Sequence, residues 1–301
     1  MTQHQSQHIP VMANEVLEKL DIKEADVVID GTINGGGHAS LFAGRLGKDG
    51  ILVGIDQDSR ALAVSANRIK NTSCKVHLVH GNFRDSGKHL KELGIEKCTK
   101  LFLDLGWSSN QLATTPGLSF QKDTPLSMVL EHPIPKDALD AATIVNTWPE
   151  PDLISLFEEL GDEEHAKEIV EKIVLERIEN PITTTFELKE IIWQAVPGYR
   201  RAKRTHPATK VFQALRIVVN KEFTNLQFLF STLSDFMASS GIVGILTFHS
   251  TEDRIVKKLI REYKEKGIIS RRHTSSVRPK WTETQSNKRS RSAKLRTFHI
   301  I

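Results

Sequence analysis

A glycine-rich stretch carries the residues best suited to holding a small ligand. Residues Asp30–His38 read DGTINGGGH and follow a short apolar run. Three adjoining glycines allow a backbone to approach a ligand closely. The spacing is neither GxGxxG nor GxxxxGK[ST], so neither usual nucleotide fingerprint is met. A ligand-binding loop is therefore predicted, with a simple tight turn as the weaker alternative.

Acidic and aromatic residues follow the next apolar runs. Asp56 lies about 20 residues beyond the loop, where a carboxylate can accept both hydroxyls of a ribose. A nucleoside without a pyrophosphate fits this pair of features best. Phe83 could place its ring against an adenine, although a core position is the alternative. Asp104 ends an apolar run, where a charge is costly unless solvated or paired, so it could meet an ammonium group or the substrate. Asp58 is predicted to begin a helix rather than bind ligand.

The elements that must position these residues alternate between strand and helix. Short β-branched runs are typical of buried parallel strands, and helical patterns separate them. The predicted strands are Val27–Asp30, Ile51–Asp56, Val76–Val79 and Leu101–Asp104, and the predicted helices are Ala39–Leu46, Ser59–Ile69 and Asp85–Leu93. This order predicts an α/β fold with a right-handed, doubly wound, Rossmann-like sheet.

The alternation stops after Asp104 and resumes late in the chain. Turn-rich sequence and then amphipathic helices fill the middle, including Asp152–Leu160 and Glu163–Glu179. The later elements are predicted as a long helix Pro207–Ala238, a strand Gly241–Phe248, a helix Glu252–Lys266 and a strand Leu295–Ile300. We therefore expect a discontinuous sheet domain, 1–106 and 207–301, with a mainly helical insertion at 107–206.

Composition and charge narrow the function classes. The 301 residues carry 41 Lys and Arg against 37 Asp and Glu, and 39% are apolar. No apolar run approaches a membrane span, which requires about 20 residues, and no leader pattern is visible, so a cytoplasmic protein is expected. Two cysteines without a CxxC support no disulfide scaffold and no thiolate metal site.

Basic residues gather in two places. Nine basic residues and one acid lie between Arg271 and Arg296, and a second run covers Arg200, Arg201, Lys203 and Arg204. Two basic clusters on an otherwise acidic chain indicate a polyanion partner. A solvated tail and loop are the alternative.

Eight segments spread along the chain resemble one family. They are HIPVMANEVL (8–17), DGTINGGGHAS (30–40), GIDQD (54–58), GNFRD (81–85), LDLGWSSNQL (103–112), HPATKVFQALRIVVNKE (206–222), FHSTEDRIVK (248–257) and RSAKLR (291–296). The chain thereby resembles the bacterial small-subunit rRNA cytosine-N4 methyltransferases, the MraW or RsmH family. The resemblance implies S-adenosylmethionine as methyl donor, and as target the N4 amine of a cytidine in the decoding region of 16S rRNA. The partner is then 16S rRNA within the small ribosomal subunit, recognised in part by the insertion; a homodimer is left open.

The resemblance also implies site residues. The predicted donor-binding set is Asn34, Gly35, Gly36, Gly37, His38, Asp56, Phe83, Asp104 and Gln111. The chemistry of the target amine, rather than the resemblance, leads to a predicted catalytic set, which would hold an N4 hydrogen and turn the lone pair toward the methyl group: Asp104, Ser108, Ser109, Asn110 and His249. For the two serines, hydroxyl groups that stabilise a turn are an equal alternative. For His249, a structural position or contact with a phosphate is an equal alternative.

One stretch departs from the family pattern. Family members usually read DGPLDMRMD where this chain reads DTPLSMVLE, so Ser127 and Val129 replace an acid and an arginine. The loss of an arginine removes a bidentate clamp for phosphate or carboxylate. A catalytically impaired relative that binds S-adenosylmethionine and assists ribosome assembly is therefore the alternative function. An NAD-dependent dehydrogenase is disfavoured by the glycine spacing.

Overall fold

The computed structural model describes residues 10–106 and 109–301 and divides the chain into two compact units. One unit comprises residues 1–108 and 223–301 and contains the sheet; the other comprises residues 109–222. The sheet unit contains strands β1 (Val27–Asp30), β2 (Ile51–Asp56), β3 (Lys75–His80), β4 (Cys98–Asp104), β5 (Met237–Thr247), β6 (Ile269–Val277) and β7 (Lys294–Ile300). Its helices are α1 (Ala13–Leu20), α2 (Gly37–Ala43), α3 (Ser59–Arg68), α4 (Ser86–Glu92), α12 (Glu222–Phe236), α13 (Ser250–Glu265) and α14 (Trp281–Ser286), with short 3₁₀ turns η1 (Phe83–Asp85) and η2 (Lys288–Ser292).

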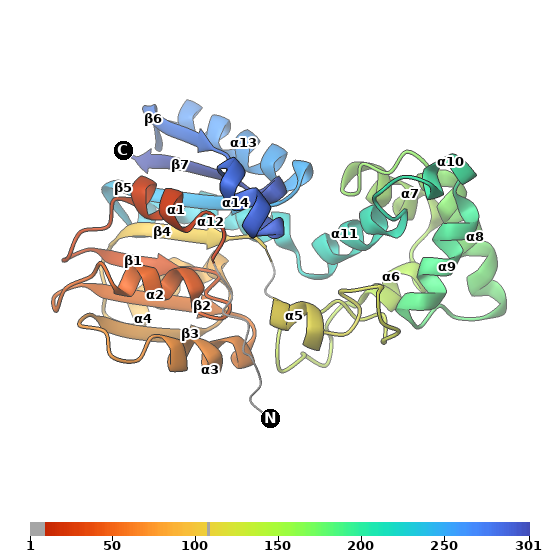
Figure 1. Ribbon diagram of the computed structural model, residues 1–301, viewed down its shortest axis with the longest axis horizontal. Coiled ribbons are helices and arrows are strands. Elements are labelled where there is room, and N and C mark those ends of the chain that lie inside the picture. The colour runs from red at the N-terminus through yellow and green to blue at the C-terminus, as the bar shows by residue number, and fades with distance from the viewer. Residues whose placement is uncertain (1–9, 107–108) are drawn as a thin grey trace. The chain divides into compact units, whose positions relative to one another are not determined.

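The seven strands form one sheet in the order β3-β2-β1-β4-β5-β7-β6 (Figure 1). Neighbouring strands from β3 through β5 pair in parallel, and β7 is antiparallel to both of its neighbours. The order reverses at β1 and β4, which is where doubly wound sheets bind ligands at the carboxyl ends of their strands. The predicted α/β, doubly wound, Rossmann-like sheet is confirmed.

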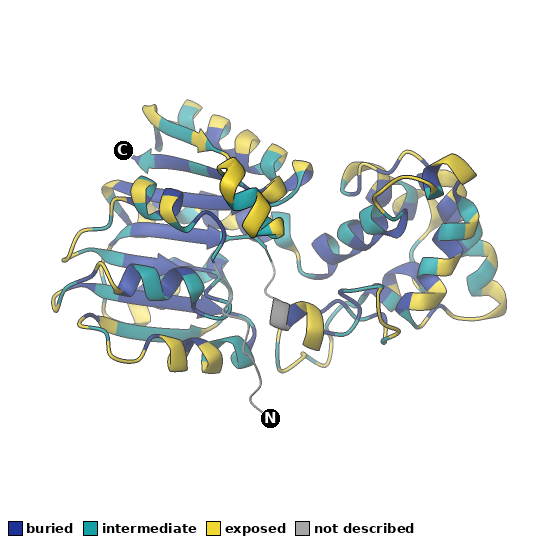
Figure 2. Ribbon diagram, viewed as in Figure 1, coloured by how far each residue is buried: buried dark blue, intermediate teal, exposed yellow. Residues whose placement is uncertain are grey.

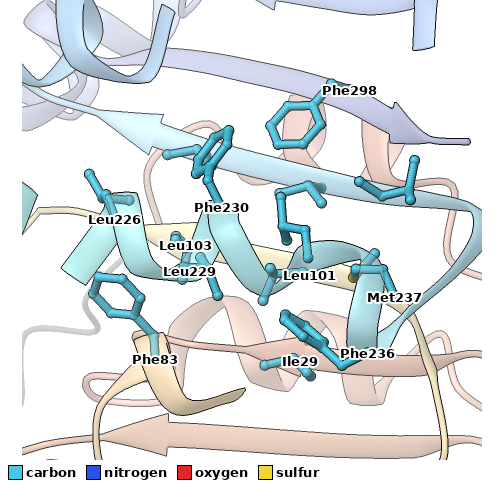
Figure 3. Packing of buried hydrophobic residues seen from close by; sticks show 14 of the residues in the cluster. Ile29, Phe83, Leu101, Leu103, Leu226, Leu229, Phe230, Phe236, Met237 and Phe298 are labelled. Carbon is cyan, nitrogen blue, oxygen red and sulfur yellow. The ribbon is translucent and has the colours of Figure 1, made fainter. Parts of the chain in front are cut away.

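Alternating strand residues feed two separate cores, one on each face of the sheet. Val28 and Leu52 pack with residues of α1 and α2, whereas Ile29 and Val53 pack with residues of α4, α12 and α13. Successive side chains of a strand point to opposite faces, so a run that is apolar at every position requires cover on both. Figure 3 shows the second of these cores, in which Phe230 and Phe298 lie among aliphatic side chains.

The helical unit contains α5 (Ser109–Thr114), α6 (Ala141–Thr147), α7 (Glu150–Glu159), α8 (Ala166–Glu179), α9 (Thr185–Ala195), α10 (Gly198–Arg201) and α11 (Ala208–Val219). Two of these helices begin at residues that cap them: Asp140 caps α6, and Thr184 with Glu187 forms a capping box at α9. The predicted helices at 152–160 and 163–179 correspond to α7 and α8.

The helix predicted over Pro207–Ala238 is wrong as a single element. It is broken at Asn220–Lys221, where Lys221 adopts the left-handed backbone conformation with φ 52°. The first half, α11, packs on α6, α7 and α9 of the helical unit. The unit boundary therefore lies at 222/223 rather than at 206/207, because the apolar face of α11 is buried among those helices.

Three elements of the sheet unit had no sequence prediction: α1, the edge strand β6 and the short helix α14. Strand β6 is polar and largely exposed, so its sequence lacks the apolar run that marks the inner strands. Within residues 10–106 and 109–301, no helix has the length and apolar character needed to cross a membrane.

Candidate functional site

The glycine loop connects β1 to α2 at the carboxyl edge of the sheet. Gly31 donates its N–H to the carbonyl of Phe102 at 2.9 Å, which holds the start of the loop against β4. A Cβ at Gly31 would lie 2.5 Å from Leu103 Cδ2, so no larger residue fits there without movement. Gly36 has φ +71° and faces the backbone of Ser65, which explains why glycine occupies the last turn before α2.

Asp56 at the end of β2 is held by the same loop. One carboxylate oxygen accepts the N–H of Asn34 at 2.8 Å, and the other accepts the N–H of Asp58 at 2.9 Å. Burial raises the pKa of Asp56 to about 6, against the opposing effect of these backbone hydrogen bonds. Asp58 caps α3 by accepting the N–H of Arg60, as predicted. Asp56 therefore presents an oriented pair of acceptors at the loop.

His38 and Asp104 meet across the loop. His38 Nε2 lies 2.9 Å from the carbonyl of Val11, so this nitrogen carries the hydrogen. His38 Nδ1 lies 3.6 Å from Asp104 Oδ2. Burial lowers the pKa of His38 to about 4, so the ring is neutral at pH 7 and the contact is not an ion pair. Two acceptors then face one another, an arrangement that suits a bound cation with hydrogens to donate.

Asp104 is itself fixed by short hydrogen bonds. Its backbone N–H donates to Thr32 Oγ1 at 2.6 Å, and its Oδ1 accepts the N–H of Gly106 at 3.0 Å. Thr32 comes from the glycine loop, so the ends of β1 and β4 are held together. The roles of Thr32 and of the Val11 carbonyl were missed in the sequence, because neither residue type marks a ligand site by itself.

Asp30 lies below this edge and is 1% exposed. Burial raises its pKa to about 8, and the nearby carboxylates of Asp104 and Asp56 act in the same direction. The N–H of Thr32 donates to Asp30 at 3.3 Å. Three carboxyl groups thus share one end of the sheet, and they influence one another's protonation.

Phe83 lies in the hydrophobic core on the α4, α12 and α13 face and is 9% exposed (Figure 3). A Cβ added at Gly31 would lie 3.0 Å from the Cβ of Phe83, so the phenylalanine borders the glycine loop from inside. The position matches the core alternative. Contact with an adenine remains an expectation.

His249 occupies a structural position. It caps α13, with Nδ1 accepting the N–H of Glu252 at 3.3 Å and Nε2 lying 2.6 Å from the Glu252 carboxylate. Both ring nitrogens are engaged at the start of the helix. This position matches the structural alternative for His249, and its catalytic role remains an expectation.

Four predicted residues follow Gly106 in the sequence: Ser108, Ser109, Asn110 and Gln111. Ser108 falls outside the described residues. Ser109 and Asn110 begin α5 of the helical unit. Gln111 is buried in the same unit, so its role as a donor contact remains the expectation drawn from the resemblance.

Part of each basic cluster is engaged within the protein. Arg200 is 3% exposed and donates to the carbonyl of Thr205, and Arg201 donates to the carbonyls of Gln194 and Val196 at the end of α9. In the other cluster, Lys294 and Arg296 both pair with Asp253 at 2.6–3.0 Å. Asp253 thus balances the charges of Lys294 and Arg296, and burial leaves Arg200 little surface for contact with a phosphate.

The stretch that departs from the family pattern is held by α11. The Asn220 side chain accepts the N–H of Leu130 and donates to the carbonyl of Met128, each at 2.9 Å. Between them Val129 is buried, at 7% exposed. Arg216, which is 2% exposed, pairs at 2.6 Å with Glu222, and the two residues flank Asn220 in the sequence. The HPAT to NKE segment therefore builds the helical unit.

One family model and several solved structures are similar to this chain. The sequence model of the MraW methylase family matches residues 5–301. A putative rRNA-methylase from Clostridium thermocellum is 12% identical, with 97% of this chain and 99% of that chain covered and a TM-score of 0.44. A putative methyltransferase from Streptococcus mutans in complex with SAH is 9% identical, with coverage of 97% and 99% and a TM-score of 0.41. Fibrillarin from Aeropyrum pernix with natively bound S-adenosyl-L-methionine is 11% identical, with coverage of 92% and 67% and a TM-score of 0.39.

Proposed function

Because this chain belongs to the MraW methylase family of S-adenosylmethionine-dependent methyltransferases, we propose that it methylates the N4 amine of a cytidine in the decoding region of 16S rRNA. S-adenosylmethionine is the methyl donor. The observation that carries the proposal is the family match from residue 5 to residue 301, together with the carboxyl groups at the ends of β1, β2 and β4.

The residues at the sheet edge fit the donor by their chemistry. Asp56 offers two oriented oxygens to the hydroxyls of a ribose. His38 Nδ1 and Asp104 Oδ2, both acceptors 3.6 Å apart, suit the α-ammonium of the methionine part. At Gly35 an added Cβ would meet only Val64 Cγ1 within 4 Å, at 3.8 Å, so the loop backbone can be approached closely there. Asn34, Gly35, Gly36, Gly37, His38, Asp56, Phe83, Asp104 and Gln111 remain the proposed donor-binding set.

The bound donor supplies an electrophilic methyl group on a sulfonium, which an amine can accept in a single in-line displacement. Most of the acceleration then comes from orientation and electrostatics. Asp104 is fixed by Thr32 and Gly106, so its carboxylate can hold a cation without first having to reorganise. A rigid negative charge at this place would hold the ammonium group of the donor in one position.

The cytosine amine must also be prepared for attack. Its lone pair is delocalised into the ring, so an acceptor that holds one N4 hydrogen can turn the lone pair toward the methyl group. We assign this role to Asp104 and to the segment that follows it, which contains Ser108, Ser109 and Asn110. The N4 nitrogen would gain the methyl group as the bond from that carbon to sulfur breaks, S-adenosylhomocysteine would leave as the neutral thioether, and N4 would then release one proton to solvent. The base reaches the site only when it is unstacked from its RNA neighbours.

Labelled S-adenosylmethionine, incubated with the protein and small subunits that lack the modification, tests the proposal. Digestion of the rRNA and mass spectrometry of the nucleosides should give N4-methylcytidine. Incorporation at another atom or in another RNA would refute the assignment of the target. Tight donor binding without any incorporation would favour the impaired relative, for which the buried Val129 in place of an arginine is the specific observation.

A further inference from the structure

An exposed tryptophan begins α14. Trp281 is 75% exposed, the largest exposed fraction but one among the large apolar side chains that are described as exposed. Figure 2 shows most of α14 in the colour of exposed residues. Burial stabilises a tryptophan side chain more than most others, so an exposed tryptophan on an ordered helix can bury its ring against a binding partner.

The segments that flank Trp281 are basic. Four basic side chains in them are exposed: Arg278, Lys280, Lys288 and Arg291. None of the four forms an ion pair within the part of the chain that the structure describes, although the charge of Lys280 helps to lower the pKa of Glu18 on α1. The one acid between Arg278 and Arg291, Glu283, is turned to the backbone N–H of Met12 at 2.7 Å. The charge of this surface is therefore positive.

The segment 280–293 is a fixed part of the sheet unit. Backbone hydrogen bonds link Thr284 to Lys280 and Asn287 to Glu283, and Ser290 is fully buried. A stacking surface needs such rigidity, because a mobile aromatic ring must be ordered on binding.

The contact of Glu283 also ties this segment to the glycine loop. Glu283 accepts the N–H of the peptide group between Val11 and Met12, and His38 donates to the carbonyl of the same peptide group at 2.9 Å. One peptide group therefore joins α14 to the histidine that faces Asp104. RNA bound at α14 would therefore be attached to the same rigid part of the sheet unit as the donor-binding loop.

We propose that Trp281 and the exposed basic residues around it form a stacking platform for an unpaired nucleotide of single-stranded RNA next to the target cytidine. The inference rests on the proposed function for the identity of that RNA. Bases stack on exposed aromatic rings while neighbouring cations follow the phosphates, and this combination is typical of surfaces that bind single strands.

Fluorescence anisotropy with a labelled single-stranded RNA oligonucleotide tests the platform directly. Trp281→Ala should weaken binding roughly 5- to 150-fold, since a stacked base contributes about 1–3 kcal/mol. Trp281→Phe should retain most of the affinity. The matched control is Phe228→Ala, which removes another exposed aromatic ring from the same unit and should leave binding unchanged. Equal binding by wild type and Trp281→Ala would overturn the platform, as would an equal loss in the control.

A salt titration tests the charges. Lys280→Ala with Lys288→Ala should reduce the slope of log K against log salt by about 0.7 for each phosphate that is no longer neutralised. An unchanged slope would show that these lysines do not contact phosphates of the RNA. The two proposals fail separately: loss of RNA binding in Trp281→Ala without any methylation by the wild type would refute only the proposed function. Full rRNA methylation by Trp281→Ala at limiting subunit concentration would refute only the platform.

Discussion

Replacing Asp104 by asparagine removes a charge and keeps the shape of the site. The new side-chain oxygen can still accept the N–H of Gly106, and the new amide can donate to His38 Nδ1, which lies 3.6 Å from Oδ2 in the parent. The fold should therefore tolerate the change. A hydrogen bond to a charged group contributes about 1.5–3 kcal/mol, so affinity for S-adenosylmethionine should fall about 10- to 150-fold.

Isothermal titration calorimetry measures this loss. Methylthioadenosine, which lacks the amino acid part, should bind Asp104→Asn as it binds the parent, because it carries no ammonium. Asp49→Asn makes the same change in net charge at an exposed loop position and serves as the control. If Asp104→Asn bound S-adenosylmethionine with parental affinity, Asp104 would not hold the ammonium. An equal loss with methylthioadenosine would show that the whole site had been disturbed.

Three further predictions concern stability. Burial raises the pKa of Asp30 from a usual 3.8 to about 8, so the folded chain holds a proton that the unfolded chain releases. The contribution of Asp30 to the free energy of unfolding should therefore fall as pH rises from about 4 to about 8. Asp30→Asn should make the urea midpoint depend less on pH when it is measured at pH 5, 7 and 9. Gly31→Ala should cost about 1–3 kcal/mol by overpacking, whereas Gly198→Ala, with nothing within 4 Å, should leave the unfolding midpoint unchanged. Glu222→Ala should cost about 3 kcal/mol in chemical denaturation, because it leaves the buried Arg216 without its carboxylate, and a loss under about 1 kcal/mol would contradict a structural role for the pair.

The inner strands and the glycine loop could be predicted because their signals are local. Val27–Asp30 and Ile51–Asp56 were predicted with the bounds that the structure has, since a run buried on both faces is apolar at every position. Asp56 could be placed as well, because the carboxyl ends of parallel strands meet at one edge. The cap formed by Asp58 follows from residue type and position alone.

Tertiary contacts decided which polar residues stayed available. Histidine and arginine are residue types that often serve in functional sites. In this protein, however, His249 caps a helix and contacts Glu252, and Arg200 is buried and donates to the carbonyl of Thr205. Their partners are close in sequence, but only the folded backbone turns the side chains toward them. A sequence shows which groups can carry charge, and the fold decides which of those charges are already satisfied.

The sequence by itself determined the inner strands of the sheet, the loop and the acids at its edge, because apolar periodicity and glycine placement act over a few residues. Only the tertiary structure decided that α11 belongs to the helical unit and that one peptide group connects His38 with Glu283. That connection joins residues more than 200 positions apart. It depends on how the chain ends pack beside the sheet, and no pattern within either segment encodes it.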